Sequence, residues 1–323
     1  MACFTPKQAW VSVLQLNPKS GKRYVAFRET EFVGGTEQIK VQCSKCDGCR
    51  IERARQWAVR CWHEASLYQN NSFITLTFAP EYLDSEGSLR KVDFQKFLKR
   101  LRKKFVPECP WKVSTKKYPE SFMREAWAER YSIRYYHCGE YGEKKGRPHH
   151  HAALFNFQFP DLVHTRNTDA GYPVFTSEIL SELWPYGRHE IGDVTLESAG
   201  YVARYILKKV GGPAAREHYK LLEPEYTTMS RNPGIATNWF KKYQTDIYPG
   251  DFVAMEGGFK ALPPKFYDKK YELTNPEEFA TLKAARVERA KNNPDNTPER
   301  LAVRHELLKR KLKLLKRGYE NDN

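Results

Sequence analysis

Three consecutive histidines, His149, His150 and His151, follow a Gly-Arg-Pro turn and precede an apolar run in GRPHHHAALF. Alternate side chains of a β-strand point to the same face, so we expect His149 and His151 to face together and His150 to face away. Two imidazoles placed in this way can chelate a divalent cation. The alternative is a solvated edge strand whose histidines bind nothing.

A carboxylate in the preceding segment can complete this metal site. Residues 131–141 have the pattern of a strand, GEKKGRP that of a turn and 149–157 that of a second strand, so the two predict an antiparallel hairpin. Glu140 then lies across the turn, on the same face as His149 or His151. Because mixed imidazole and carboxylate ligation suits Mn²⁺ and tolerates Mg²⁺, we expect one of these ions at the three side chains.

Two tyrosines form a second motif that could do chemistry. Tyr201 and Tyr205 lie four residues apart in GYVARYILKKV, so both hydroxyls leave one face of the expected helix, with Lys208 and Lys209 one turn beyond. A phenol beside a metal-polarised phosphate can act as a nucleophile and form a phosphotyrosine, and a neighbouring lysine can activate it or hold a phosphate. Alone, this spacing is typical of a packing stripe. Its combination with the His-x-His strand favours catalysis.

A cysteine run forms a third motif, separate from the other two. Cys43, Cys46 and Cys49 have a spacing that fits three thiolate ligands for zinc, and Cys3 is a candidate fourth. A [4Fe–4S] cluster is disfavoured because Arg53 stands where the fourth cysteine of a bacterial ferredoxin run would fall. Three cysteines in seven residues rarely arise from packing, so we favour a structural zinc site over free thiols.

The surrounding sequence must hold these side chains on one scaffold. Apolar periodicity and turn residues predict strands at 72–78, 131–141, 149–157 and 187–196, and helices at 92–105, 176–184 and 198–210. Asp93 and Ser198 are the expected N-caps of two of these helices. The order β-α-β-β-α-β-α predicts a central antiparallel sheet with helices on its faces, an α+β fold.

Weaker patterns flank this core on both sides. Short β-like runs at 10–16 and 24–27 precede a helix expected over 50–68, and the pattern after residue 212 is irregular and rich in aromatic residues. A basic helix then begins at Thr297, its expected N-cap, and runs to Arg317. We therefore expect three parts: 1–70, an N-terminal Cys-rich segment and helix; 71–212, the core; and 213–323, a C-terminal basic, helical extension.

The charge of the chain points to its partners. Lysine and arginine total 54 against 39 acidic residues, a formal net charge of +15, which favours nucleic acid first and an anionic membrane surface second. The basic runs 98–104 and 309–317 are assigned to DNA phosphates, with solvated helix faces as the alternative. We expect no membrane span and no signal peptide, and an odd count of seven cysteines suggests reduced thiols in a cytoplasm.

These motifs together resemble a known family. His149-His150-His151 is similar to the HUH motif of rolling-circle replication initiators, and Tyr201 with Tyr205 is similar to the two-tyrosine version of that family's catalytic helix. More narrowly, the chain resembles the replication initiators of gokushovirus-like single-stranded DNA phages of the Microviridae. The segments that carry this resemblance are CSKCDGCR, FITLTF, GSLRKVDFQKFLKRLRK, CGEYGEKKGRPHHHAALF, GYVARYILKK and MSRNPGIATNWFKKY. The central HUH position is usually hydrophobic, so His150 is a departure.

The resemblance implies an HUH endonuclease fold and a DNA nickase and strand transferase. A metal at His149, His151 and Glu140 would polarise the scissile phosphate, and Tyr201 or Tyr205 would attack it, retaining the 5′ phosphate and releasing a 3′-OH. The implied substrate is a single-stranded DNA origin. The implied partners are a host helicase and polymerase in the bacterial cytoplasm.

Two other functions remain open from the sequence. One is a non-catalytic, zinc-stabilised DNA-binding protein whose histidines and tyrosines are structural. The other is a related HUH relaxase or transposase. A GxxxxGK[ST] run is missing from the sequence, so we predict no fused helicase.

Overall fold

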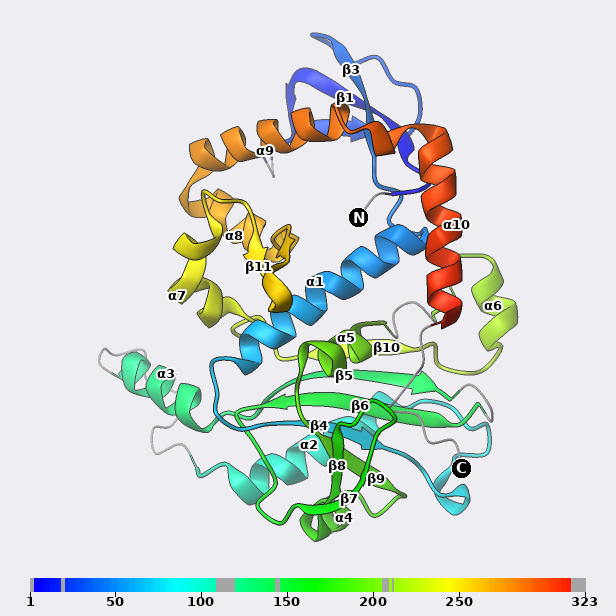
Figure 1. The fold of residues 1–323 in the computed structure, drawn as a ribbon, viewed down its shortest axis with the longest axis vertical. Helices are drawn as coiled ribbons and strands as arrows, with labels where there is room; N and C mark the ends of the chain where they lie inside the picture. Colours follow the sequence, from blue (N-terminus) through cyan, green and yellow to red (C-terminus); the bar gives the residue numbers. More distant parts are fainter. Residues whose placement is uncertain are drawn as a thin grey trace. The chain divides into compact units, whose positions relative to one another are not determined.

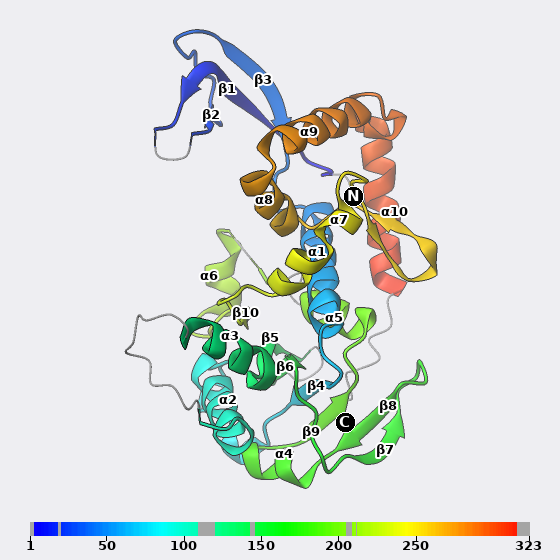
Figure 2. The ribbon, with the colours of Figure 1, turned by 90° about the vertical axis from the view of Figure 1, so that its left-hand side faces the viewer.

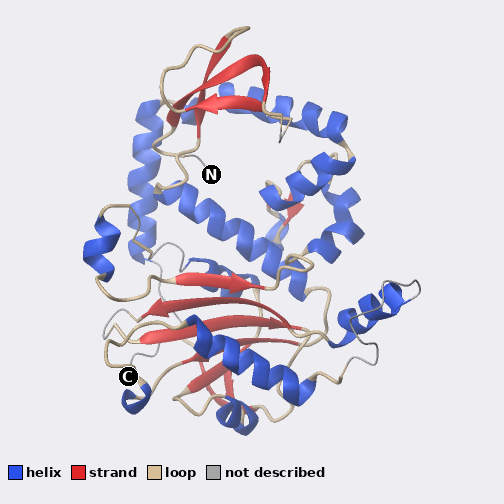
Figure 3. Cartoon of the chain, turned by 180° about the vertical axis from the view of Figure 1, so that it is seen from behind, coloured by secondary structure: helices blue, strands red, loops and turns tan. Residues whose placement is uncertain are grey.

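An antiparallel sheet with helices on both faces forms the larger part of this computed structural model, which describes residues 3–18, 21–108, 120–142, 146–204, 209–210 and 212–314 (Figure 3). The chain separates into two units, Met1–Arg53 with Lys283–Leu315 and Ala54–Leu282 with Lys316–Asn323. The expected α+β class is confirmed. The functional division into 1–70, 71–212 and 213–323 stays a prediction.

The main sheet lies in the second unit and has seven strands in the order β10-β5-β6-β4-β9-β8-β7 (Figure 1). Every neighbouring pair is antiparallel. Its strands are β4 (Asn71–Leu76), β5 (Arg134–Tyr141), β6 (Pro148–Phe155), β7 (Val163–Asn167), β8 (Pro173–Thr176), β9 (His189–Gly192) and β10 (Tyr226–Met229). The central strands β4, β5 and β6 are buried along most of their length, because helices cover both faces.

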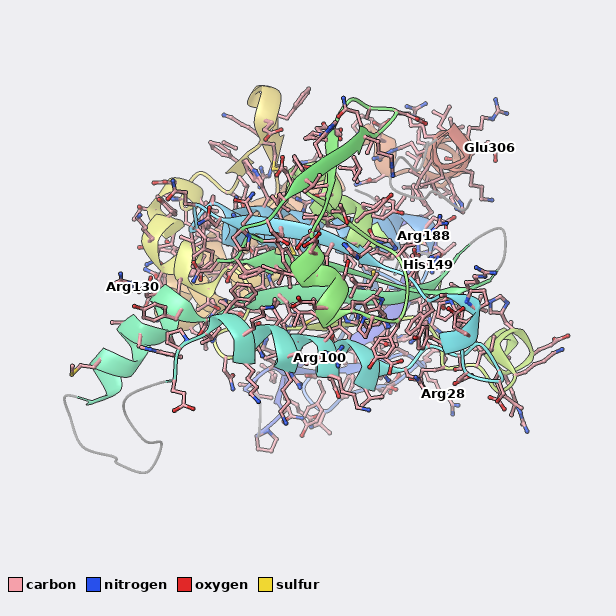
Figure 4. The ribbon with its side chains drawn as sticks, turned by 90° about the horizontal axis from the view of Figure 1, so that it is seen from below. Arg28, Arg100, Arg130, His149, Arg188 and Glu306 are labelled. Atoms are coloured by element: carbon pink, nitrogen blue, oxygen red, sulfur yellow. The ribbon has the colours of Figure 1, made fainter. Side chains whose placement is uncertain are left out.

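One face of this sheet packs on α2 (Lys91–Phe105) and α4 (Glu178–Leu183), which lie in front of the sheet in Figure 4. The other face packs on the second half of α1 (Asp47–Ala65), on α5 (Leu196–Arg204), α7 (Thr237–Ile247) and α8 (Lys265–Thr274). Figure 2 shows α5 on the side of the sheet opposite α2 and α4. Two hydrophobic cores therefore enclose the sheet, and alternate residues of each strand enter different cores.

Further elements complete the second unit. They are η1 (Pro80–Tyr82), α3 (Glu120–Tyr131), α6 (Ala214–Tyr219), β11 (Val253–Ala254), η3 (Glu256–Gly258) and β12 (Lys260–Ala261). A buried ion pair ties its parts together, since the Arg134 guanidinium of β5 donates to the Glu64 carboxylate of α1, which also accepts from the Ala236 amide.

The first unit contains a small antiparallel sheet of order β2-β1-β3, formed by β1 (Lys7–Leu16), β2 (Arg23–Ala26) and β3 (Thr36–Val41). It also contains the end of α9 (Pro276–Lys291), η4 (Pro294–Asn296) and α10 (Pro298–Leu314). The Thr297 hydroxyl accepts a hydrogen bond from the Arg300 amide at 3.3 Å, which confirms the expected N-cap of α10.

The two other expected N-caps are wrong by one turn. Helix α2 begins at Lys91, and Asp93 lies inside its first turn, where its carboxylate accepts from the Arg90 guanidinium at 3.0 Å. Helix α5 begins at Leu196, because Thr195 and Ser198 exchange hydrogen bonds between side chain and amide at 2.8 and 3.1 Å. This reciprocal pair is a capping box, which places the cap three residues before Ser198.

The structure also corrects the expected ends of the core. Helix α5 ends at Arg204, and Lys209 lies outside any helix, so the helix expected to reach residue 210 is shorter. The region after residue 212 contains regular structure, and its strand β10 joins the edge of the main sheet beside β5. The polar sequence YTTM gave no apolar alternation because an edge strand is buried on fewer sides. Among the helices of the described ranges, none has the length and apolar character needed to cross a membrane.

Candidate metal and tyrosine site

The β5–β6 hairpin brings the three expected metal ligands together. Its register places Glu140 directly opposite His149, and Cys138 opposite His151, so all four side chains share one face. One ligand atom from each of Glu140, His149 and His151 lies within 4.8 Å of the others. The sequence prediction of this grouping is therefore matched by the geometry.

The three side chains differ in their exposure to solvent. Glu140 and His151 are buried, and Glu140 Oε1 lies 2.9 Å from His151 Nε2. His149 is partly exposed, at the rim of the group in the strand where Figure 4 labels it. A buried carboxylate beside two imidazoles supplies one negative charge and three donor atoms, so this set fits a divalent cation such as Mn²⁺ or Mg²⁺.

A neighbouring hydroxyl orients one of these imidazoles. Thr75 of β4 pairs with His151 in the sheet, and its Oγ1 lies 3.0 Å from His151 Nδ1. This contact occupies one ring nitrogen and directs the other, Nε2, toward Glu140, as supporting groups of metal ligands commonly do. The sequence analysis missed Thr75, although its place in the alternation of SFITLTF sets it on one face of the strand with Phe73.

Helix α5 carries Tyr201 to the same face. The Tyr201 ring lies 5.5 Å from the His151 ring at an interplanar angle of 83°, and 6.2 Å from the Phe73 ring at 78°. Ala199 and Val202 are fully buried in the same core and hold the helix on the sheet. A segment some fifty residues from the hairpin therefore places a phenol beside the expected metal ligands.

The other residues of the tyrosine motif are placed less fully. Tyr205 and Lys208 lie outside the described residues. Lys209 is exposed and follows the end of α5.

His150 points to the opposite face, as expected from strand alternation. It is fully buried, and its Nδ1 lies 3.1 Å from Nε2 of His137, whose Nδ1 lies 2.8 Å from Thr228 Oγ1. The His137 ring also stacks on Phe94 at 3.6 Å. Burial lowers the pKa of His150 to about 3 and the pKa of His137 well below its usual value, so both rings are neutral at pH 7.

Comparison with known proteins gives the family of this chain. Residues 71–210 match the family model of the ORF2-type replication-associated proteins. The chain is 34% identical over 237 residues to replication-associated protein VP4 of Bdellovibrio phage phiMH2K, covering 73% of this chain and 69% of that protein. The chain belongs to the microvirus-like phage replication-associated proteins.

Two further relatives of this replication-associated protein extend the match. Replication-associated protein ORF2 of Spiroplasma virus 4 is 34% identical over 249 residues, covering 74% of this chain and 70% of that protein. Replication-associated protein ORF4 of Chlamydia phage 1 is 28% identical over 273 residues, covering 80% and 62%. No solved structure gives a significant match. The range of the family model contains Glu140, His149, His151 and Tyr201.

The cysteine motif of the replication-associated protein lies before the range of that model. The Sγ atoms of Cys3 and Cys46 are 3.9 Å apart, and those of Cys43 and Cys49 are 4.0 Å apart. All four Sγ atoms lie within 4.8 Å of one another. The N-terminal cysteine that the sequence offered as a fourth ligand is therefore beside the other three, inside the first unit.

The basic run 98–104 of this protein lies on α2, on the face of the sheet opposite Glu140 and Tyr201. Arg100 donates to the Leu183 carbonyl at 2.7 Å, and Arg102 donates to the Ile133 carbonyl at 2.7 Å. These arginines bind backbone carbonyls inside the unit, while the assignment of the run to DNA phosphates stays a prediction. Of the run 309–317, the structure describes residues 309–314, at the end of α10.

Proposed function

We propose that this protein is a metal-dependent DNA nickase and strand transferase of the HUH class, which starts rolling-circle replication of single-stranded phage DNA. One observation carries the proposal: Tyr201 of α5 packs 5.5 Å from the ring of His151, whose Nε2 contacts Glu140. A phenol beside a convergent carboxylate and imidazole set has the composition of a phosphotransfer site. Membership of the phage replication-associated proteins supports the same conclusion.

The proposed chemistry assigns a role to each side chain. Glu140, His149 and His151 would hold a divalent cation, which supplies positive charge to the non-bridging oxygens of the scissile phosphate. The phenolic oxygen of Tyr201 attacks phosphorus, forming an O–P bond as the bond from phosphorus to the 3′ oxygen breaks. The 5′ phosphate stays on the tyrosine, and the released 3′ oxygen becomes the hydroxyl that a host polymerase extends.

The phosphotyrosine conserves the energy of the phosphodiester, so the strand can be resealed by the reverse reaction. A 3′-hydroxyl attacks the phosphorus, and the tyrosine leaves. Tyr205 would carry the second transfer, and Lys208 or Lys209 would hold a phosphate of the bound strand. These steps require a single-stranded origin and a host helicase and polymerase, so we assign the reaction to the bacterial cytoplasm.

The test is formation of a covalent adduct. The full chain is incubated with Mn²⁺ and single-stranded oligonucleotides that tile the circular genome encoding it, and adducts are resolved on a denaturing gel. We expect one oligonucleotide to give an SDS-resistant adduct, and the Tyr201→Phe/Tyr205→Phe double variant to give none. Tyr82→Phe, at an exposed tyrosine of η1, is the matched control and keeps the adduct.

The opposite outcome supports a different function. If the wild-type chain binds the oligonucleotides without forming an adduct, or if the double variant nicks as well as the wild type, the tyrosine mechanism is wrong. The protein is then a non-catalytic DNA-binding protein in which Tyr201 serves packing, a role consistent with its burial in the core beside Phe73.

A further inference from the structure

We propose that Cys3, Cys43, Cys46 and Cys49 bind one zinc ion in a closed tetrahedral site, and that this site forms the surface on which α10 docks. The site lies wholly in the first unit. It is independent of the proposed nicking reaction, because none of its residues belongs to the range that carries Glu140, His151 and Tyr201.

The distances between the sulfur atoms fit a single metal ion. Zinc binds thiolates at about 2.3 Å in a tetrahedron, which places the sulfur atoms about 3.8 Å apart. The pairs Cys3–Cys46 and Cys43–Cys49 are separated by 3.9 and 4.0 Å. A disulfide requires about 2.05 Å between sulfur atoms, and all four cysteines are free thiols. The four side chains therefore converge as ligands do.

The local backbone favours the thiolate form of these sulfur atoms. Cys43 Sγ accepts hydrogen bonds from the Thr5 hydroxyl at 3.2 Å and from the amides of Lys45 and Cys46 at 3.4 and 3.2 Å. The Cys43 amide donates to Cys3 Sγ at 3.2 Å. Ser44 has a φ of 62°, and this left-handed turn points the following amides at the sulfur. Donors gathered on sulfur stabilise the negative charge that a metal ligand must carry.

The chemistry of the donors selects the metal. Four soft thiolates in a tetrahedron select zinc over the Mn²⁺ or Mg²⁺ suited to the carboxylate and imidazole set. A [4Fe–4S] cluster attaches each thiolate to a different iron, which spreads the sulfur atoms beyond the 4.8 Å found here. With four protein ligands the site has no open position, so its role is structural.

One side chain of α10 contacts both segments that the ligands bring together. The His305 ring stacks on Phe4, the neighbour of Cys3, with ring centroids 4.7 Å apart. His305 Nε2 lies 3.0 Å from the Asp47 carboxylate, next to Cys46. Phe4 and Asp47 are far apart in the sequence, and the four cysteines hold them beside each other. Without the metal, we expect His305 to lose this paired surface.

The metal is tested on the full chain by elemental analysis and by cobalt substitution. We expect one zinc per chain, loss of that zinc in Cys46→Ser, and retention in Cys61→Ala, which removes a buried cysteine outside the cluster. Cobalt bound to the wild-type chain should give the visible absorption of a tetrahedral tetrathiolate, a result that does not depend on whether a variant folds. Stoichiometric iron, zinc retained by Cys46→Ser, or a cobalt spectrum of six-coordinate oxygen ligands overturns the site.

The docking of α10 is tested by hydrogen exchange of the same chain with and without zinc. Removal of zinc by a chelator should raise exchange at least tenfold in residues 298–312, while β5 and β6 keep their protection. His305→Ala should keep its zinc and lose the protection of α10. Unchanged exchange of α10 after zinc removal overturns the coupling. His149→Ala should retain the zinc in every case, so failure of this proposal is separate from failure of the nicking mechanism.

Discussion

On one face of the β5–β6 hairpin, His151 lies between Thr75 and Glu140, and on the other face His137 lies between Thr228 and His150. Each group joins a threonine hydroxyl, an imidazole and a second ionisable side chain through contacts of 2.8 to 3.1 Å. Both are buried. The last member differs, because it is a carboxylate on one face and a second imidazole on the other.

This difference decides what each face can bind. A carboxylate with two imidazoles, one of them at the partly exposed rim, offers negative charge and converging donors to a cation. Two neutral imidazoles hydrogen-bonded to each other and stacked on Phe94 satisfy their own polar atoms inside a core. A histidine triplet in one strand is therefore divided into two functions by the partners on its two faces.

Truncation of adjacent histidines should separate chemistry from stability. His149→Ala should lower metal-dependent adduct formation by more than about 100-fold, with a change in stability within about 0.5 kcal/mol, because its side chain lies at the rim. His150→Ala should lower the unfolding free energy by about 2–4 kcal/mol, because it leaves a buried cavity and removes the partner of His137. Adduct assays and urea unfolding measure the two effects.

The pair has a clear failing outcome and a control. His164→Ala, at an exposed histidine of β7, should change neither quantity. If His149→Ala forms adduct at the wild-type rate, the rim histidine is no ligand and the distinction between the faces is lost.

Acid should destabilise the buried imidazoles that lack a carboxylate partner, of which His63 is a further example. Its Nδ1 lies 2.8 Å from the Tyr267 hydroxyl, and burial lowers its pKa from 6.5 to about 3. Below pH 6.5 the unfolded chain binds a proton that the folded chain excludes, so stability falls with pH by about 1.4 kcal/mol per unit. Between pH 7 and 5, His63→Leu should lose about 2 kcal/mol less stability than the wild type in urea unfolding. Equal losses would contradict this linkage.

The threonines give the smallest and most closely matched test. Thr75→Val removes the hydroxyl beside His151 and should weaken Mn²⁺ binding about 10-fold, measured by calorimetry, because the imidazole loses its orienting contact. Thr228→Val removes the hydroxyl beside His137 and should cost about 1 kcal/mol of stability with no change in Mn²⁺ affinity. Equal effects of the two substitutions on Mn²⁺ affinity would remove the contrast between the faces.

The sequence was sufficient for contacts that local geometry governs. Strand alternation placed His149 and His151 on one face and His150 on the other, and the short turn placed Glu140 across the hairpin. Cap positions were less well predicted, since Ser198 satisfies a reciprocal pair with Thr195 that either residue could begin. The strand β10 was missed, because the edge position that it occupies imposes little apolar pattern.

The sequence by itself therefore determined which residues carry donors and which of them share a strand face, because the period of a strand is a local property of the backbone. Only the tertiary structure decided the partners: Thr75 for His151, His137 for His150, and α5 with Tyr201 over the hairpin. These contacts join segments that are distant in the chain. They depend on how two hydrophobic cores close around one sheet, and no local pattern encodes that arrangement.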